Sequence, residues 1–269
     1  MSHQAQQYRS QRALIEAFQR WQSDGLSEVD IALLVAQVID EQVDCDRVRE
    51  QISQLANQAN ESAIGDVDTL LAFLRSKGFA QPSMTTVDLT HSSIDWLLQQ
   101  HQALPIVVAI LTITLARMLG MQAEGVNFPG HFLLRVNGEL VDPLALAVIQ
   151  QEKLQLPDGL QFEDTLSKAS PLTIGFRMLN NLKAYYFQFK NWPAMLLATE
   201  YQLAISHDEP SLACMVYFER GEYLQWMNDE DAALVEYASC LEIAPDDALA
   251  EKAKARIAQI VNAHSGPMH

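Results

Sequence analysis

The sequence predicts a mostly helical α+β protein, and three observations support this prediction. Residues 104–120 form an expected helix that is apolar on nearly all sides, which is typical of a helix at the centre of a core; Pro105 suits its first turn and Gly120 its end. Asn137-Gly138, the strongest short signal for a two-residue type I′ turn, places a β-hairpin after it. Helical periodicity covers most of the chain on both sides.

Composition limits the classes of function. With 269 residues and 49% hydrophobic content, the chain can form one large domain or two ordinary ones. It carries 18 Lys and Arg against 34 Asp and Glu, a net charge of -16 without a basic cluster in the sequence. We therefore expect neither a nucleic acid nor a membrane as a partner. The N-terminus lacks an apolar signal core, and residues 106–115 are too few to cross a bilayer, so a soluble, cytoplasmic protein is expected.

The three cysteines give no sign of a metal site or a disulfide. Cys45, Cys214 and Cys240 are odd in number and widely spaced, without a CxxC motif or a Cys/His pair. We expect free thiols, as in a reducing cytoplasm, and no metal or cofactor.

Local signals define the elements that precede the central helix. Residues 11–59 show helical spacing of apolar residues, with Ser27 as the N-cap of the second helix in this region. A further helix is expected over residues 66–79, and another opens at the capping-box-like residues 92–95 and runs to Gln100. These helices are interpreted as packing elements without chemistry of their own.

The hairpin brings two polar side chains onto one face. With Asn137-Gly138 as the turn, Leu133 lies opposite Asp142, and His131 lies diagonal to that carboxylate at about 7 Å between backbones. An imidazole oriented by a carboxylate is the base of a nucleophilic triad. The alternative is that both are ordinary polar residues, with Asp142 starting an Asp-Pro turn.

The order of these motifs resembles a known family. An apolar helix ending in ARMLGM, then GHFLLRV with its His and LVDP with its Asp, resembles the core of transglutaminase-like proteins. In those enzymes a Cys at the helix start, a His on the next strand and an Asp on the following one form a papain-like triad. The resemblance implies that His131 and Asp142 correspond to the His and the Asp. It places Pro105 at the position of the catalytic Cys.

One branch of this family also resembles the chain more widely. SirB-type, or YchA-like, bacterial proteins join a transglutaminase-like core to tetratricopeptide repeats, and they are similar to this chain in LPIVVAILTITLARMLG, VNFPGHFLLRV and DIALLVAQVID, over about residues 25–260. No other side chain offers a replacement nucleophile. Thr112 and Thr114 lie too far along the helix, and the acidic neighbours of Cys45 disfavour a thiolate.

The C-terminal third is helical from Pro171, so domains are expected over residues 1–170 and 171–263. The segment EDAALVEYASCLEIAP resembles the second helix of a tetratricopeptide repeat. The small residue of the first helix is then Gly221, and Ala233 is its expected partner where the two helices cross. The other repeat positions fall on Tyr217, Leu224, Tyr237, Cys240 and Pro245, and those of a weaker preceding copy on Leu182, Tyr185, Phe189, Ala198 and Pro210.

Two functions remain open. The first is a non-catalytic, scaffold-type interaction protein that binds a protein or peptide through a cleft beside Pro105 and through the repeats. The expected contact residues are Asn127, Phe128, Gly130 and His131 in the cleft, and Tyr217 and Leu224 on the repeats. The second is a hydrolase or acyl transferase in which His131 and Asp142 act with water or a bound group as the nucleophile. The repeats could also serve only to support the core.

Overall fold

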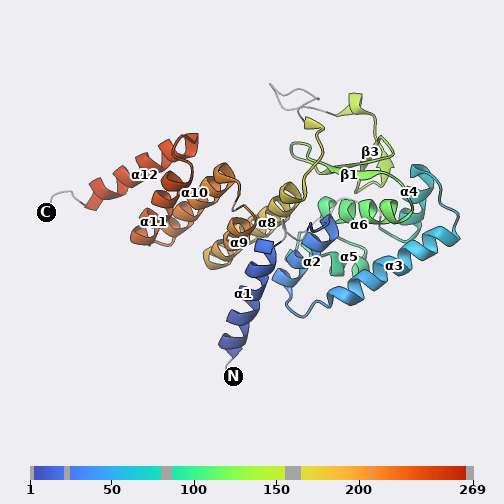
Figure 1. The fold of residues 1–269 in the computed structure, drawn as a ribbon, viewed down its shortest axis with the longest axis horizontal. Coiled ribbons are helices and arrows are strands. Elements are labelled where there is room, and N and C mark those ends of the chain that lie inside the picture. Colours follow the sequence, from blue (N-terminus) through green and yellow to red (C-terminus); the bar gives the residue numbers. More distant parts are fainter. Residues whose placement is uncertain (1–2, 21–24, 80–86, 155–164, 207, 265–269) are drawn as a thin grey trace. The chain divides into compact units, whose positions relative to one another are not determined.

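The computed structural model describes residues 3–20, 25–79, 87–154, 165–206 and 208–264. The chain divides into two compact units (Figure 1). The core unit comprises Met1–Leu14 and Ser23–Met178, and the helical unit comprises Ile15–Gln22 and Leu179–His269. The division between the units falls inside a helix, after Met178, and a short N-terminal segment belongs to the second unit.

Helices form most of the core unit. They are α1 (His3–Arg20, shared with the helical unit), α2 (Glu28–Ile39), α3 (Cys45–Glu61), α4 (Val67–Ser76), the short 3-10 helix η1 (Leu89–Ser92), α5 (Ile94–Gln100) and α6 (Pro105–Met118). Side-chain oxygens cap the starts of α3, α4 and α5, where Asp44, Asp66 and Ser93 accept free N–H groups of the first turn. Ser27 is the N-cap of α2, as expected, and its N–H donates to Asp30 Oδ2 at 2.9 Å. Ser93 is the N-cap of α5. Within the described ranges, no single helix is both long and apolar enough to cross a bilayer.

The central position of α6 is confirmed. The helix lies between the sheet on one side and α2, α3 and α5 on the other (Figure 1). Pro105 is its first residue, and ten of its side chains are buried. The hydroxyls of Thr112 and Thr114 donate to the carbonyl oxygens of Val108 and Ile110, both at 2.8 Å, which satisfies these polar groups inside an apolar helix.

The sheet contains the predicted hairpin. Its antiparallel strands follow the chain order β1 (Ala123–Val126), β2 (Leu133–Val136), β3 (Glu139–Asp142) and β4 (Ala147–Val148). Val136 pairs with Glu139 in the expected register. Asn137 and Gly138 have φ angles of 47° and 90°, the positive values that a type I′ turn requires at both central positions.

A buried carboxylate joins the first turn of α2 to the last turn of α6. The Glu28 side chain, 6% exposed, accepts hydrogen bonds from Nη1 and Nη2 of Arg117 at 2.6 and 2.9 Å. Burial by itself would raise the pKa of Glu28, but the hydrogen bond and charge of Arg117 outweigh it and hold the pKa below its ordinary value of 4.5.

The helical unit contains the rest of α8 (Pro171–Gln188), then α9 (Trp192–Ile205), α10 (Pro210–Trp226), α11 (Glu230–Ile243) and α12 (Ala248–His264). The expected close crossing at Gly221 is present, but its partner differs. A Cβ at Gly221 would lie 2.5 Å from Cε1 of Tyr237, so the tyrosine ring, and not Ala233, fills the space against the glycine.

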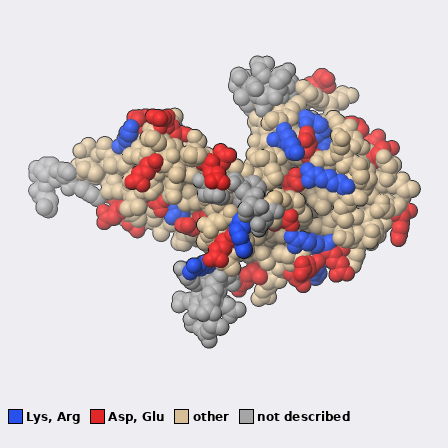
Figure 2. All heavy atoms as spheres, viewed as in Figure 1, with Lys and Arg blue, Asp and Glu red and all other residues tan. Residues whose placement is uncertain are grey.

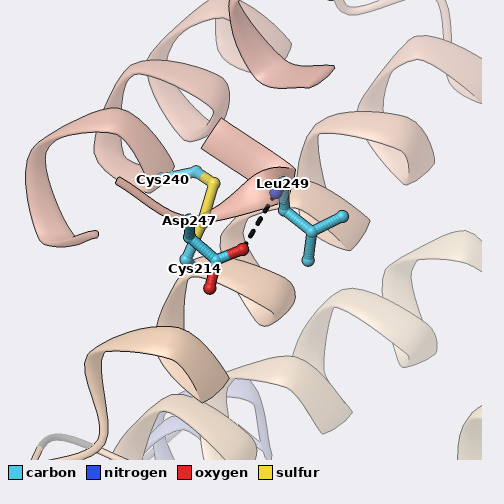
Figure 3. Close-up of a disulfide and its surroundings, with 4 residues drawn as sticks. All are labelled: Cys214, Cys240, Asp247 and Leu249. Atoms are coloured by element: carbon cyan, nitrogen blue, oxygen red, sulfur yellow. Dashed lines mark hydrogen bonds between the residues drawn. A yellow bond between two sulfur atoms is a disulfide. The ribbon is translucent and has the colours of Figure 1, made fainter. Parts of the chain in front are cut away.

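The expectation of free thiols at all three cysteines is wrong. Cys214 on α10 and Cys240 on α11 form a buried disulfide (Figure 3). They are 26 residues apart in sequence, and the packing of α11 against α10 brings their Cα atoms to 4.2 Å. Near the bridge, the Asp247 carboxylate accepts from the N–H of Leu249 at 2.9 Å, at the start of α12 (Figure 3).

Arg220 connects three helices of the helical unit. From α10, its guanidinium contacts Glu200 of α9 at 2.7 Å and Glu236 of α11 at 2.8 Å, and it donates to Thr199 Oγ1 at 2.9 Å. The side chain is only 13% exposed. Burial would lower the pKa of Arg220, but the two carboxylates raise it above its ordinary value. Arg220 therefore places a buried ionic contact between α9, α10 and α11.

We predict that Arg220→Ala lowers the free energy of unfolding by about 3 kcal/mol, because two partly buried carboxylates lose their counter-charge. Urea unfolding measures the change. Arg256→Ala is the matched control, because Arg256 forms a more exposed pair with Glu222 at 3.4 Å and should cost less than about 1 kcal/mol. Equal losses in the two variants would contradict the role assigned to Arg220.

We predict that Glu28→Gln lowers the free energy of unfolding by about 2 kcal/mol at neutral pH. Because folding lowers the pKa of Glu28, its contribution is complete above the ordinary value of 4.5 and is lost as the pH falls through the folded-state value. The difference between parent and variant should therefore shrink on acidification from about pH 7 to about pH 3. Urea titrations at several pH values test this, with exposed Glu61→Gln as the control. If the difference in unfolding free energy between parent and variant did not change with pH, the charge of Glu28 would not be the cause of the stabilisation.

Candidate functional site

The start of α6 carries no nucleophile. Pro105 occupies the first helical position, and the only free cysteine in the described part of the chain is Cys45, at the start of α3. Burial, together with the charges of Asp46 and Asp44, raises the pKa of the Cys45 thiol. A raised pKa disfavours the thiolate that nucleophilic attack requires.

The Asp142 carboxylate is engaged in a turn. It ends β3, and its Oδ1 accepts from the backbone N–H of Leu144 at 2.8 Å and of Ala145 at 3.4 Å. An aspartate that accepts from the N–H two residues later forms an Asx turn. This geometry matches the Asp-Pro turn that the sequence left open as an alternative.

His131 lies outside the β-ladder. β2 begins at Leu133, so the diagonal relation expected for a continuous strand does not reach back to His131. Gly130, with a φ of 75°, bends the chain just before it, and the His131 N–H donates to the Phe128 carbonyl oxygen at 3.2 Å. The side chain is exposed, and in the described part of the chain no hydrogen bond joins it to Asp142.

Arg177 holds the loop that carries His131. From α8, its Nη1 donates to Asn127 Oδ1 at 2.6 Å and to the Phe128 carbonyl oxygen at 3.2 Å. The guanidinium also lies over the Phe132 ring, 5.5 Å from its centroid. Burial lowers the pKa of Arg177. Sequence analysis missed this residue; its only signal was a lone basic position among the buried Ile174, Phe176 and Met178 of α8.

The other expected contact residues differ in accessibility. Asn127 is exposed, whereas Phe128 is buried in a cluster with Val126, Leu133 and Leu140. In the helical unit, Leu224 is buried in the cluster that contains the disulfide, so its side chain does not offer a contact surface. Tyr217 is half-buried and lines a pocket of about 460 Å³. The rest of that pocket is formed by Ile15, Gln19, Glu200, Leu203 and Ala204.

The family model described as the transglutaminase-like superfamily matches residues 42–180, which cover α6, the sheet and the start of α8. The chain belongs to the transglutaminase-like superfamily. The resemblance seen in the sequence is confirmed for the core, and this family member lacks a thiol at the start of α6.

The chain is also similar to bacterial proteins described as UPF0162 proteins. It is 24% identical to one from Vibrio cholerae over 259 residues, which cover 87% of this chain and 92% of that protein. It is 28% identical to one from Xylella fastidiosa, over 56% of this chain and 60% of that protein. It is 31% identical to one from Pseudomonas aeruginosa, over 46% of this chain and 48% of that protein. These relatives support a SirB-type, YchA-like core. No solved structure gives a significant match.

The described residues contain no group of three or more His, Cys, Asp and Glu side chains that could hold a metal ion. Around the loop, the imidazole of His131 is exposed, the carboxylate of Asp142 accepts hydrogen bonds within a turn, and the guanidinium of Arg177 donates to the loop backbone. These groups form a surface loop beside the hairpin and include no thiol or hydroxyl.

We predict that Arg177→Ala loosens residues 127–132, because Asn127 Oδ1 and the Phe128 carbonyl lose their donor, at a cost of about 1–3 kcal/mol. Amide hydrogen exchange should become faster in this loop and stay unchanged in α3. Arg177→Lys should give an intermediate effect, since an ammonium keeps the charge but not the planar fork. Unchanged exchange in Arg177→Ala would show that the loop is held by other contacts.

Proposed function

We propose that this protein is a non-catalytic member of its superfamily that acts as a scaffold by binding a protein or peptide partner. The observation that carries the proposal is the start of α6, where Pro105 is the first residue. By the family resemblance this is the position of the triad cysteine, and the one free cysteine among the described residues, Cys45, lies at the start of α3. The separation of His131 from Asp142 supports the same conclusion, because no hydrogen bond joins the two side chains in the described part of the chain and Asp142 therefore does not orient the imidazole.

We further propose that α8 to α11 form two tetratricopeptide-type hairpins. The tight contact of Gly221 with the Tyr237 ring supports this, since close helix crossings require a small residue. Pro210 opens α10 and Pro245 precedes α12, so the repeated prolines fall between helices. The repeats then present side chains to a partner rather than serving only as a support.

The proposed contact surface is the aromatic cluster of Phe187, Trp192 and Trp226, which come from α8, α9 and α10. The two tryptophan rings are 5.0 Å apart, and each lies 5.8 Å from the Phe187 ring. Phe187 and Trp226 remain 51% and 47% exposed. Exposed aromatic groups of this size are typical of protein contact sites. The Tyr217 pocket is a second candidate surface of the same unit.

The proposal keeps the cytoplasmic location expected from the sequence. Disulfides are rare in the reducing cytosol, so the redox state of Cys214 and Cys240 in cells bears directly on it. Thiol labelling of freshly lysed cells measures that state. A fully oxidised pair would count against the cytoplasmic location without affecting the proposed binding role.

We predict that a photo-crosslinking residue at position 226 captures a defined partner in cells, and that the same residue at position 235 does not. Val235 is the matched control, because it is 66% exposed on α11 of the same unit. A second variant combines the probe at position 226 with Phe187→Ser. If Phe187 contributes about 1.4 kcal/mol to the binding free energy, this variant should capture at least about tenfold less product. Equal capture at both positions would remove the aromatic cluster from the proposed interface.

The enzymatic alternative has a separate test. A panel of amide, ester and thioester substrates is offered to the parent protein and to His131→Ala. The scaffold proposal expects no turnover from either protein. Turnover by the parent that the folded variant loses would overturn the proposal and assign catalysis to the exposed imidazole.

A further inference from the structure

A pocket of about 440 Å³ lies at the turn end of the β2–β3 hairpin. Gly138 of the turn and Gln122, which precedes β1, form part of its wall. His131 precedes β2 at the other end of the same hairpin, so this pocket is separate from the loop that carries the family histidine.

Three cationic side chains line this pocket. Arg117 comes from the last turn of α6, Arg135 from β2, and Lys168 from the segment that bridges to Val126 of β1. Figure 2 shows Lys and Arg side chains gathered over the part of the core unit that carries the sheet. In a chain with a net charge of -16, folding has thus collected basic groups that the sequence keeps far apart.

The charges do not cancel within the pocket. Glu28 pairs with Arg117, and Glu124 pairs with Arg135 at 2.7 Å. Lys168 is exposed, and in the described part of the chain its ammonium makes no hydrogen bond; Glu28 acts on it through longer-range charge. Three cations against two carboxylates leave one positive charge in excess.

The two guanidinium groups are held in fixed positions. Arg117 Nε donates to the Ala123 carbonyl oxygen at 2.9 Å, in addition to its two bonds to Glu28. Arg135 Nη2 donates to the Leu166 carbonyl oxygen at 3.2 Å. A guanidinium has five N–H groups, so both arginines keep donors beyond those used in these contacts. Fixed donors bind an anion without losing side-chain freedom.

We propose that this pocket binds a small oxyanion, the carboxylate or phosphate group of a low-molecular-weight ligand. Lys168 supplies the unpaired positive charge, and Arg117 and Arg135 supply oriented N–H donors. The acidic surface of the rest of the chain repels an extended polyanion, so the site selects a small ligand over a nucleic acid. This inference is independent of the scaffold role proposed above.

The test is calorimetric titration of the full chain at low ionic strength with inorganic phosphate, succinate and neutral glycerol. We expect saturable binding of phosphate, succinate or both with a Kd of about 1 mM, and no binding of glycerol. Binding of phosphate alone assigns the site to phosphate, and binding of succinate alone to carboxylate. Added salt should weaken the binding, because the contact is between charges at a partly open site.

Lys168→Glu is the decisive variant, with Lys252→Glu on α12 as its control. Both lysines are exposed and both changes alter the net charge equally, so folding and overall charge are matched. Lys168→Glu should raise the Kd at least about tenfold, while Lys252→Glu leaves it unchanged. The proposal would be wrong if the heat released by phosphate and by succinate showed no saturation up to about ten times the expected Kd. It would also be wrong if the two variants changed the Kd equally.

Discussion

The fold depends on one constraint, which is that α6 is apolar on nearly all sides. Such a helix must be covered on every side, and the chain meets this requirement with the sheet on one side and α2, α3 and α5 on the other. Its ends are then the only places where polar chemistry can occur. At the last turn, Arg117 meets Glu28, whereas the first turn begins at Pro105 and carries no thiol.

The sequence predicted the elements whose causes are local. The central helix, its first residue and the Asn137-Gly138 turn follow from hydrophobic periodicity and turn chemistry, and the structure contains all of them. The disulfide and the Tyr237 contact at Gly221 were not predicted, because each depends on how α10 and α11 pack. Sequence spacing shows that two residues are compatible with contact, but only tertiary structure brings them together.

At the candidate site, too, the contacts that depend on tertiary structure could not be predicted from the sequence. The register of the hairpin was predicted correctly, yet β2 begins two residues after His131, because the preceding loop bends at Gly130 and is held by Arg177. A pairing rule that assumes a continuous strand therefore fails at its end. Arg177 comes from a helix about fifty residues later, so no local pattern near the loop could have indicated it. The two ends of one hairpin consequently differ in chemistry, with an isolated imidazole at one end and grouped cations at the other.

The contacts of Arg220 determine how the helical unit can come apart. In a simple repeat array each unit touches only its neighbours, so terminal units can unfold separately. Here one side chain is shared by α9, α10 and α11, and a covalent bridge also joins the last two. These three helices must therefore open together, in a single cooperative transition. The helical unit thereby gains the cooperative unfolding of an ordinary globular domain.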